Sequence, residues 1–154
     1  MRVRDLAQRN EVAVHPGDPA GAAAASLVQS GLRAVPVVDE TGQLVGMLRD
    51  VDVLRLLLPD YLGDLTDLSF LPPDLDLGSC NFADACGALV SDALRIDDTC
   101  AVDGNEPVLE AVRIMSALAL PVLPVVDEAR PTGVITSETL LRRIAETSAG
   151  LEAP

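Results

Sequence analysis

The sequence predicts an α+β fold made of two copies of one unit, each running strand, helix, strand, strand, helix. The segment "PVVDE" occurs at Pro36 and again at Pro124, and in each copy a tight turn and a glycine-led apolar segment follow it, at Gly46 and at Gly133. With 154 residues, 49% of them hydrophobic, the chain is long enough to bury a core. Two copies are too few for a solenoid, so we expect a pseudo-twofold pair packed face to face.

The elements of each unit follow from local signals. Pro19 and Pro107 suit the first turn of a helix, and Val108, Val112 and Met115 recur at helical spacing. In the first copy the expected strands are 11–14, 34–39 and 44–48, and the first helix is 20–30. In the second copy the expected strands are 99–102, 122–127 and 132–136, and the first helix is 108–118.

Each unit is expected to end in a helix with an apolar stripe. Asp50 and Ser137 are residue types that cap helix N-termini, so we expect them to be the N-caps of these helices. The expected stripes are Val51, Leu54 and Leu58 in the first copy, and Leu140, Leu141 and Ile144 in the second. The resulting organisation is a first repeat at 1–58, a structured linker or insertion at 59–88, a second repeat at 89–147 and a flexible tail at 148–154.

The linker contains all three aromatic residues of the chain, Tyr61, Phe70 and Phe82. It is too apolar for a flexible tether, and we expect short helices in it, one of them near 82–89. It has two interpretations: a structural cover over one face, which we favour, or an element that docks a partner.

The charge of the chain excludes several functions. The net charge is −13, from 24 acidic and 11 basic residues, which argues against a nucleic-acid surface and against binding to an anionic membrane.

The N-terminus lacks the apolar core of a signal peptide, and the apolar run 20–28 is far shorter than the ~20 residues of a spanning helix. We therefore expect a soluble cytoplasmic protein.

The sequence gives no support for catalysis or for a metal site. Cys80, Cys86 and Cys100 form no C-x-x-C pair, and His15 is the single histidine. A structural zinc site needs four ligands at suitable spacing, and a catalytic triad needs a histidine beside a nucleophile. We expect reduced thiols, a histidine in an exposed loop, and neither an enzyme nor a bound cofactor.

The doubled order of strand, helix, "PVVDE", turn and glycine-led strand resembles a CBS-domain pair, also called a Bateman module. The resemblance implies two sheets packed together with two clefts, which in that family often bind adenosine-containing ligands such as AMP or ATP. It also implies a homodimer that reports ligand state to a partner protein, here unknown. Such modules are not usually enzymes.

The nucleotide motif of that family reads glycine, apolar, any residue, serine or threonine, two further residues, and aspartate. In the first copy Asp52 matches the aspartate, but Arg49 replaces the hydroxyl residue. In the second copy Thr136 matches the hydroxyl residue, but Thr139 replaces the aspartate. Each copy therefore keeps one half of the motif.

Two interpretations of the split motif stay open. In the first, Asp52 holds a ribose diol and Arg49 holds a phosphate. In the second, both sites have lost binding and the fold serves dimerisation, with Arg49 pairing with Asp50, Asp52 or Asp39 in a surface salt bridge worth ~0–1 kcal/mol. The first interpretation suits the first cleft better than the second cleft.

An adenine in either cleft would lie between aliphatic side chains, although each of these residues also suits an ordinary core. The expected ligand-binding residues are Val12, Val14, Ala34, Val35, Pro36, Met47, Arg49 and Asp52 in the first copy, and Val102, Val122, Leu123, Pro124, Thr136 and Thr139 in the second. The sequence thus predicts a stand-alone regulatory pair that senses an adenine nucleotide or a related adenosyl or ribosyl ligand. The alternative is a ligand-free dimerisation and protein-interaction module.

Overall fold

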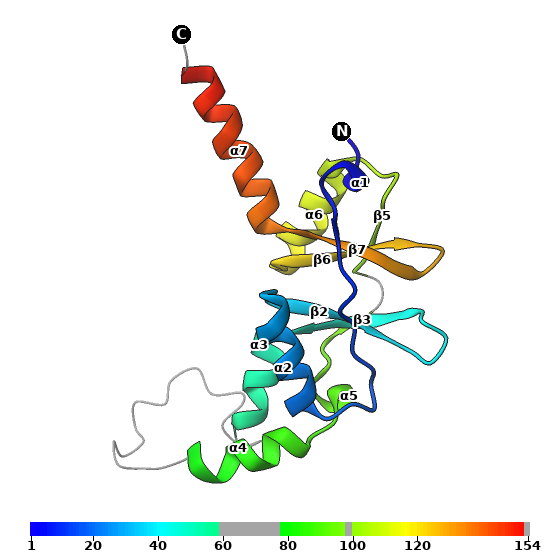
Figure 1. Cartoon of the computed structure of the whole chain (residues 1–154), viewed down its shortest axis with the longest axis vertical. Helices are drawn as coiled ribbons and strands as arrows, with labels where there is room; N and C mark the ends of the chain where they lie inside the picture. The colour runs from blue at the N-terminus through cyan, green and yellow to red at the C-terminus, as the bar shows by residue number, and fades with distance from the viewer. Residues whose placement is uncertain (59–77, 98–99, 153–154) are drawn as a thin grey trace.

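The structure, a computed structural model, describes residues 1–58, 78–97 and 100–152, with the side chains of 78–81 and 151–152 left out. Two β-sheets lie one above the other, and helices cover their outer faces (Figure 1). The predicted α+β fold with two repeated units is confirmed.

The first sheet has the strand order β2 (Ala34–Val38), β3 (Leu44–Arg49), β4 (Ile96–Asp97), all antiparallel. Val14 extends this sheet by one parallel bridge to Val37. The expected strand 11–14 is thus reduced to its last residue.

The second sheet has the order β1 (Gln8–Arg9), β7 (Arg130–Thr136), β6 (Val122–Asp127), β5 (Val102–Asp103). Strands β5 and β6 are parallel, and the other pairs are antiparallel. Only the last residue of the expected strand 99–102 belongs to β5, and residue 99 lies outside the described ranges.

The two units exchange their outermost strands. Strand β1 lies near the start of the first repeat but pairs with β7 of the second, and β4 lies near the start of the second repeat but pairs with β3 of the first. Both exchanged strands run beside a motif glycine, because Arg9 is opposite Gly133 and Asp97 is opposite Gly46. The chain therefore crosses between the sheets twice, which ties the two units into one body.

The helices cover the two sheets on opposite sides (Figure 1). Helices α2 (Ala20–Ser30) and α6 (Val108–Leu118) have the predicted bounds. The others are α1 (Val3–Leu6), α3 (Asp50–Leu54) with the 3₁₀ turn η1 (Arg55–Leu57), α4 (Gly78–Gly87), α5 (Val90–Ala93) and α7 (Ser137–Glu152). Helix α4 confirms a helix within the linker, whereas the segment 59–77 lies outside the described residues.

Helix α7 differs from the prediction at its C-terminal end. It continues to Glu152 and projects away from the sheets, so it includes most of the segment predicted as a flexible tail (Figure 1). The residues after Ile144 include no proline before position 154, and a single glycine in a helix costs only about 1 kcal/mol. Nothing in this segment therefore stops the helix at position 147.

The core has two clusters. One joins Val122, Leu123 and Ile135 of the second sheet to Ala34 and Met47 of the first, so it spans the interface between the units. The other lies under α2 and α5 and includes Val14, Val35, Val37, Leu48 and Val90. Of the expected apolar stripes, Leu140 packs against the first cluster, whereas Leu54, Leu141 and Ile144 face outward and are 58%, 64% and 65% exposed.

Candidate functional site

The split motif stands at the junction between the last strand and the last helix of each unit. Among the described residues, Asp52 and Thr136 are the two buried polar side chains, at 1% and 7% exposure. They are also the two residues that match the nucleotide motif, one in each copy. Burying a polar group costs free energy unless it is hydrogen-bonded, so both residues must have partners.

Asp52 is surrounded by arginine donors. Its Oδ2 accepts from the backbone N–H of Arg49 at 3.0 Å and from the Arg49 Nε at 3.1 Å. Its Oδ1 accepts from the Arg49 Nη2 at 2.8 Å and from the Arg55 Nη1 at 3.3 Å. The hydrogen bond with Asp52 raises the pKa of Arg49 above its usual value. Both carboxylate oxygens are thus engaged by cations of the chain.

This contact corrects the expectation of a surface salt bridge at Arg49. The Asp52 side chain is fully buried, and the Arg49 side chain is 17% exposed. The two side chains meet through two parallel N–H···O bonds, a geometry that is stronger and more specific than that of a single charge pair. Arg49 does not pair with Asp50, which instead lies 3.3 Å from Arg33.

The second copy has a neutral equivalent of this pair. The Oγ1 atoms of Thr136 and Thr139 are 3.0 Å apart, and the backbone N–H of Thr139 donates to the Thr136 Oγ1 at 3.2 Å. The Nε2 of Gln8, from the exchanged strand β1, donates to the Thr139 Oγ1 at 2.8 Å. In each copy the two motif positions are therefore hydrogen-bonded to each other.

The N-caps of the two helices lie one residue earlier than predicted, at Arg49 and Thr136 instead of Asp50 and Ser137. Helix α3 begins at Asp50, and the residue before it, Arg49, donates its backbone N–H to Asp52. Helix α7 begins at Ser137, and Thr136 accepts the N–H of Thr139 as a capping hydroxyl does. The capping position is thus also the serine or threonine position of the ligand motif, and this double role was not visible in the sequence.

The structure buries most of the aliphatic residues expected to contact an adenine. Val12 is half-buried, and the others are buried: Val14, Ala34, Val35, Pro36, Met47, Val102, Val122, Leu123 and Pro124. Apart from the two prolines, they are divided between the two core clusters. Their role as ligand contacts stays a prediction.

Two partners of the motif residues were not predicted. Arg55 lies three residues after Asp52 on the same helical turn, so its contact could have been read from helical spacing. Gln8 is 131 residues from Thr139 in the chain, and only the strand exchange brings them together. No local pattern signals that contact.

A cavity of about 390 Å³ lies beside the exchanged strand β1. Its lining includes Gln8, Arg9, Arg4 and Asn105, together with Thr132 and Gly133 of β7. Arg4 is already engaged, because its Nη1 donates to the Asn105 Oδ1 at 2.8 Å. On β7 the cavity is lined by Thr132 and Gly133, which precede the motif residue Thr136 along the strand.

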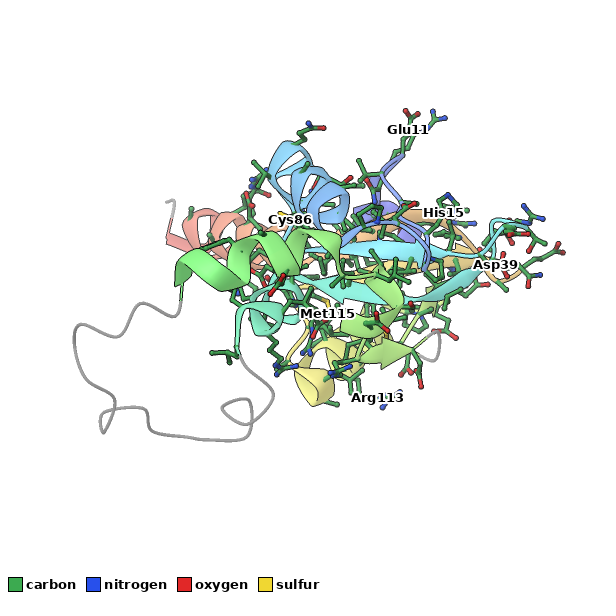
Figure 2. All side chains as sticks on the ribbon, turned by 90° about the horizontal axis from the view of Figure 1, so that it is seen from below. Glu11, His15, Asp39, Cys86, Arg113 and Met115 are labelled. Carbon is green, nitrogen blue, oxygen red and sulfur yellow. The ribbon has the colours of Figure 1, made fainter. Side chains whose placement is uncertain are left out.

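His15 behaves as a loop residue. It is exposed, its Nδ1 lies 3.0 Å from the carbonyl oxygen of Val38, and it shares a surface cavity with Asp39 (Figure 2). Over the described ranges, the structure contains no group of three or more histidine, cysteine or acidic residues arranged to hold a metal ion. Within the same ranges, no helix is both long and apolar enough to cross a bilayer.

Comparison with known proteins identifies the repeated unit. The family model described as "CBS domain" matches residues 3–59 and again residues 90–146. A curated relative is an uncharacterized protein, MJ1225, of Methanocaldococcus jannaschii, which is 26% identical over 144 residues. The match covers 93% of this chain and 47% of that protein, so the chain spans about half the length of this relative.

Solved structures share the fold over nearly the whole chain. A CBS domain-containing protein of unknown function from Kribbella flavida is 28% identical, with a TM-score of 0.71 over 94% of this chain and 99% of that one. The CBS pair of protein MJ0100, in complex with 5′-methylthioadenosine and S-adenosylmethionine, is 21% identical, with a TM-score of 0.71 over 96% and 98%. CBSX2, a protein of Arabidopsis thaliana, in complex with AMP, is 22% identical, with a TM-score of 0.68 over 96% and 98%.

Proposed function

The chain belongs to the CBS-domain family, and we propose that it is a regulatory module that senses an adenine nucleotide or a related adenosyl or ribosyl ligand. Ligand binding would change the conformation of a homodimer, which a partner protein would read. The module carries out no catalysis of its own. The ligand class is suggested by the motif and by two structures of the same fold that hold adenosyl compounds.

One observation carries this proposal: Asp52 is a buried carboxylate at the position where the family motif holds a ribose. A carboxylate has two oxygens that can accept both hydroxyl protons of a vicinal diol. A buried acid is costly unless its charge is compensated, and here Arg49 and Arg55 supply the compensation. The first cleft is therefore the proposed sensing site, with Arg49 beside the ligand phosphate.

A second candidate function is a ligand-free module for dimerisation and protein interaction. It is favoured by the contacts within the motif, because the Arg49–Asp52 and Thr136–Thr139 pairs satisfy each other without a ligand. Under this candidate the two pairs only stabilise the strand-to-helix junctions. The two candidates differ in whether any ribosyl compound binds.

Both candidates include a homodimer. Helix α7 projects from the body (Figure 1), and its Leu141 and Ile144 side chains are exposed, as is Leu54 of α3. Isolated exposed apolar residues are common, but several on a projecting helix are typical of a protein–protein contact. A second copy of the chain would cover them.

The test is a thermal-shift screen of the whole chain with AMP, ADP, ATP, NAD, S-adenosylmethionine and cyclic dinucleotides, with GTP as the base control. A ligand that binds only the native state stabilises it by RT ln(1 + [L]/Kd), about 2.7 kcal/mol at a concentration of 100 Kd. A shift with an adenosyl compound and none with GTP is the expected result. No shift with any compound would favour the ligand-free module.

The same screen on two variants locates the site. Asp52→Asn keeps the shape of the side chain but removes its charge, so the shift is expected to shrink. Asp50→Asn is the matched control, because Asp50 lies on the same helix but its side chain is 38% exposed and pairs with Arg33. An equal loss in both variants would place the ligand elsewhere.

A further inference from the structure

The side chain of Arg49 occupies the place on Asp52 that a ribose diol needs. A carboxylate offers about four lone-pair sites, and four donors already contact Asp52 in this structure. The backbone N–H of Arg49 cannot leave without unwinding the start of α3. The Arg55 contact is the longest of the four, at 3.3 Å. A ribose that reaches Asp52 must therefore displace the Arg49 guanidinium.

The displacement has different consequences for a nucleoside and for a nucleotide. A neutral diol replaces charge-assisted hydrogen bonds by ordinary ones, and it leaves a guanidinium that is 17% exposed without an anion. A nucleotide brings a phosphate, which accepts two parallel N–H bonds from a guanidinium as a carboxylate does. When a nucleotide binds, the Arg49 guanidinium leaves the Asp52 carboxylate and pairs with the phosphate. Asp52 then accepts hydrogen bonds from the ribose diol in place of the guanidinium.

The second copy lacks such a charged contact between its two motif residues. Thr136 stands where Arg49 stands in the first copy, and its contact with Thr139 is a hydrogen bond between two neutral hydroxyls. The second copy thus forms the same strand-to-helix junction without an arginine at the capping position. The arginine occurs only in the first copy, where it faces a buried carboxylate.

We propose that Arg49 is a lock on Asp52 that a phosphate-bearing ligand opens, so that the first cleft selects nucleotides over nucleosides and over cationic adenosyl compounds. This inference rests on the proposed function and names the specificity-determining residue of that site. Arg49 closes the cleft when no phosphate is present, and it becomes a phosphate ligand when a nucleotide is bound.

The test compares adenosine, AMP and S-adenosylmethionine by calorimetry on the whole chain. The wild type is expected to bind AMP at least tenfold more tightly than adenosine or S-adenosylmethionine. Arg49→Thr, which copies the second unit, is expected to reduce that preference to less than about threefold, partly through tighter binding of adenosine. Arg33→Thr is the matched control, because it removes an exposed arginine paired with Asp50 near the same helix, and it should keep the preference.

A second measurement follows the wild-type protein itself. The Nε–H signal of Arg49 in a ¹H–¹⁵N spectrum, assigned with Arg49→Lys, should shift on addition of AMP and stay unchanged with adenosine. A residue with a purely structural role would show neither the ligand preference nor the selective shift.

Several results would overturn the lock while leaving the sensing function intact. These are equal wild-type affinities for AMP and S-adenosylmethionine, or an unchanged AMP preference in a folded Arg49→Thr protein. If the wild type binds none of the compounds and Arg49→Thr binds adenosine, Arg49 blocks Asp52 even when a phosphate is present. The proposed displacement of Arg49 by a nucleotide is then wrong. If neither protein binds any compound, the proposed sensing function itself fails.

Discussion

The carbonyl oxygen of Ile96 occupies the space that a Cβ atom on Gly46 would need. The same relationship recurs in the second unit, where a Cβ on Gly133 would lie 2.5 Å from the carbonyl oxygen of Gln8. Each close approach is made by an exchanged strand, β4 or β1, against the motif strand of the other unit. The motif glycine is therefore required for the strand exchange, independently of any ligand.

Gly46→Ala is expected to destabilise the protein by about 1–3 kcal/mol, the typical cost of overpacking, because a backbone carbonyl cannot move away as a flexible side chain can. Chemical denaturation measures this change. Gly17→Ala is the matched control, because a Cβ there would meet nothing within 4 Å, and it should stay within about 0.5 kcal/mol of the wild type. Equal stability of the two variants would show that β4 does not hold this position in solution.

The parts of the fold that local patterns govern were predictable. Helices 20–30 and 108–118 have their expected bounds, because proline marks the start of each and helical periodicity marks its length. The exchanged strands β1 and β4 were not predicted. Each has two residues and is defined by a distant partner, so neither carries the alternation that identifies a longer strand.

The candidate site was predictable in its positions but not in its contacts. The repeat aligned Arg49 with Thr136 and Asp52 with Thr139, and the structure places all four at equivalent strand-to-helix junctions. The sequence could not show that each pair is internally bonded. These hydrogen bonds depend on side-chain conformations and, for Thr139, on a contact with Gln8 near the other end of the chain.

Asp39 provides a test of the turn between β2 and β3. Its Oδ1 accepts from the Thr41 hydroxyl at 2.6 Å and from the backbone N–H groups of Thr41 and Gln43. The hydrogen bond from the Thr41 side chain is the main reason that the pKa of Asp39 lies below its usual value. Figure 2 shows Asp39 at the edge of the molecule, where a carboxyl resonance can be followed by NMR.

Thr41→Val is expected to raise the pKa of Asp39 toward the usual value, measured by an NMR titration of the carboxyl carbon. Because folding lowers this pKa, the carboxylate contributes stability above its unfolded pKa, and that contribution is lost as the pH falls through the folded pKa. The variant should therefore lose less stability in acid than the wild type. Thr147→Val is the control, because the Thr147 hydroxyl donates to the carbonyl oxygen of Arg143 on α7, and it should leave the Asp39 pKa unchanged.

Leu141→Glu is expected to convert the proposed homodimer into monomers, because a charge on the exposed apolar face of α7 would be buried against the second copy without a partner. Light scattering at micromolar concentration measures the mass of the particle. Leu109→Glu is the matched control on α6, where the side chain is 79% exposed. A monomeric wild type would remove the dimer from the proposal, and dissociation by Leu109→Glu alone would move the interface to α6.

Thr139 is positioned to become the missing acid of the second cleft. Its Oγ1 already lies 2.8 Å from the Gln8 Nε2 and 3.0 Å from the Thr136 Oγ1. An aspartate at this position would accept from both of these groups and keep lone pairs for a ribose diol. It would also stand in the first turn of the 16-residue helix α7, where the helix dipole favours an acid by about 0.3–1 kcal/mol.

Thr139→Asp is therefore expected to create ribosyl-ligand binding in the second cleft, with a gain on the order of 2 kcal/mol, or roughly thirtyfold, from two charge-assisted hydrogen bonds after desolvation. Calorimetry with AMP would show one additional site per chain relative to the wild type. Thr139→Asn separates charge from shape, because the amide fills similar space but is neutral, and it should give little gain. Glu138 opposes the new charge from the neighbouring position, although the contact of its carboxylate with Arg142 at 2.6 Å reduces that repulsion. A Thr139→Asp protein that folds normally and gains neither a site nor affinity would show that the second cleft is closed by its shape, and that the hydroxyl retained at Thr136 serves only to cap α7.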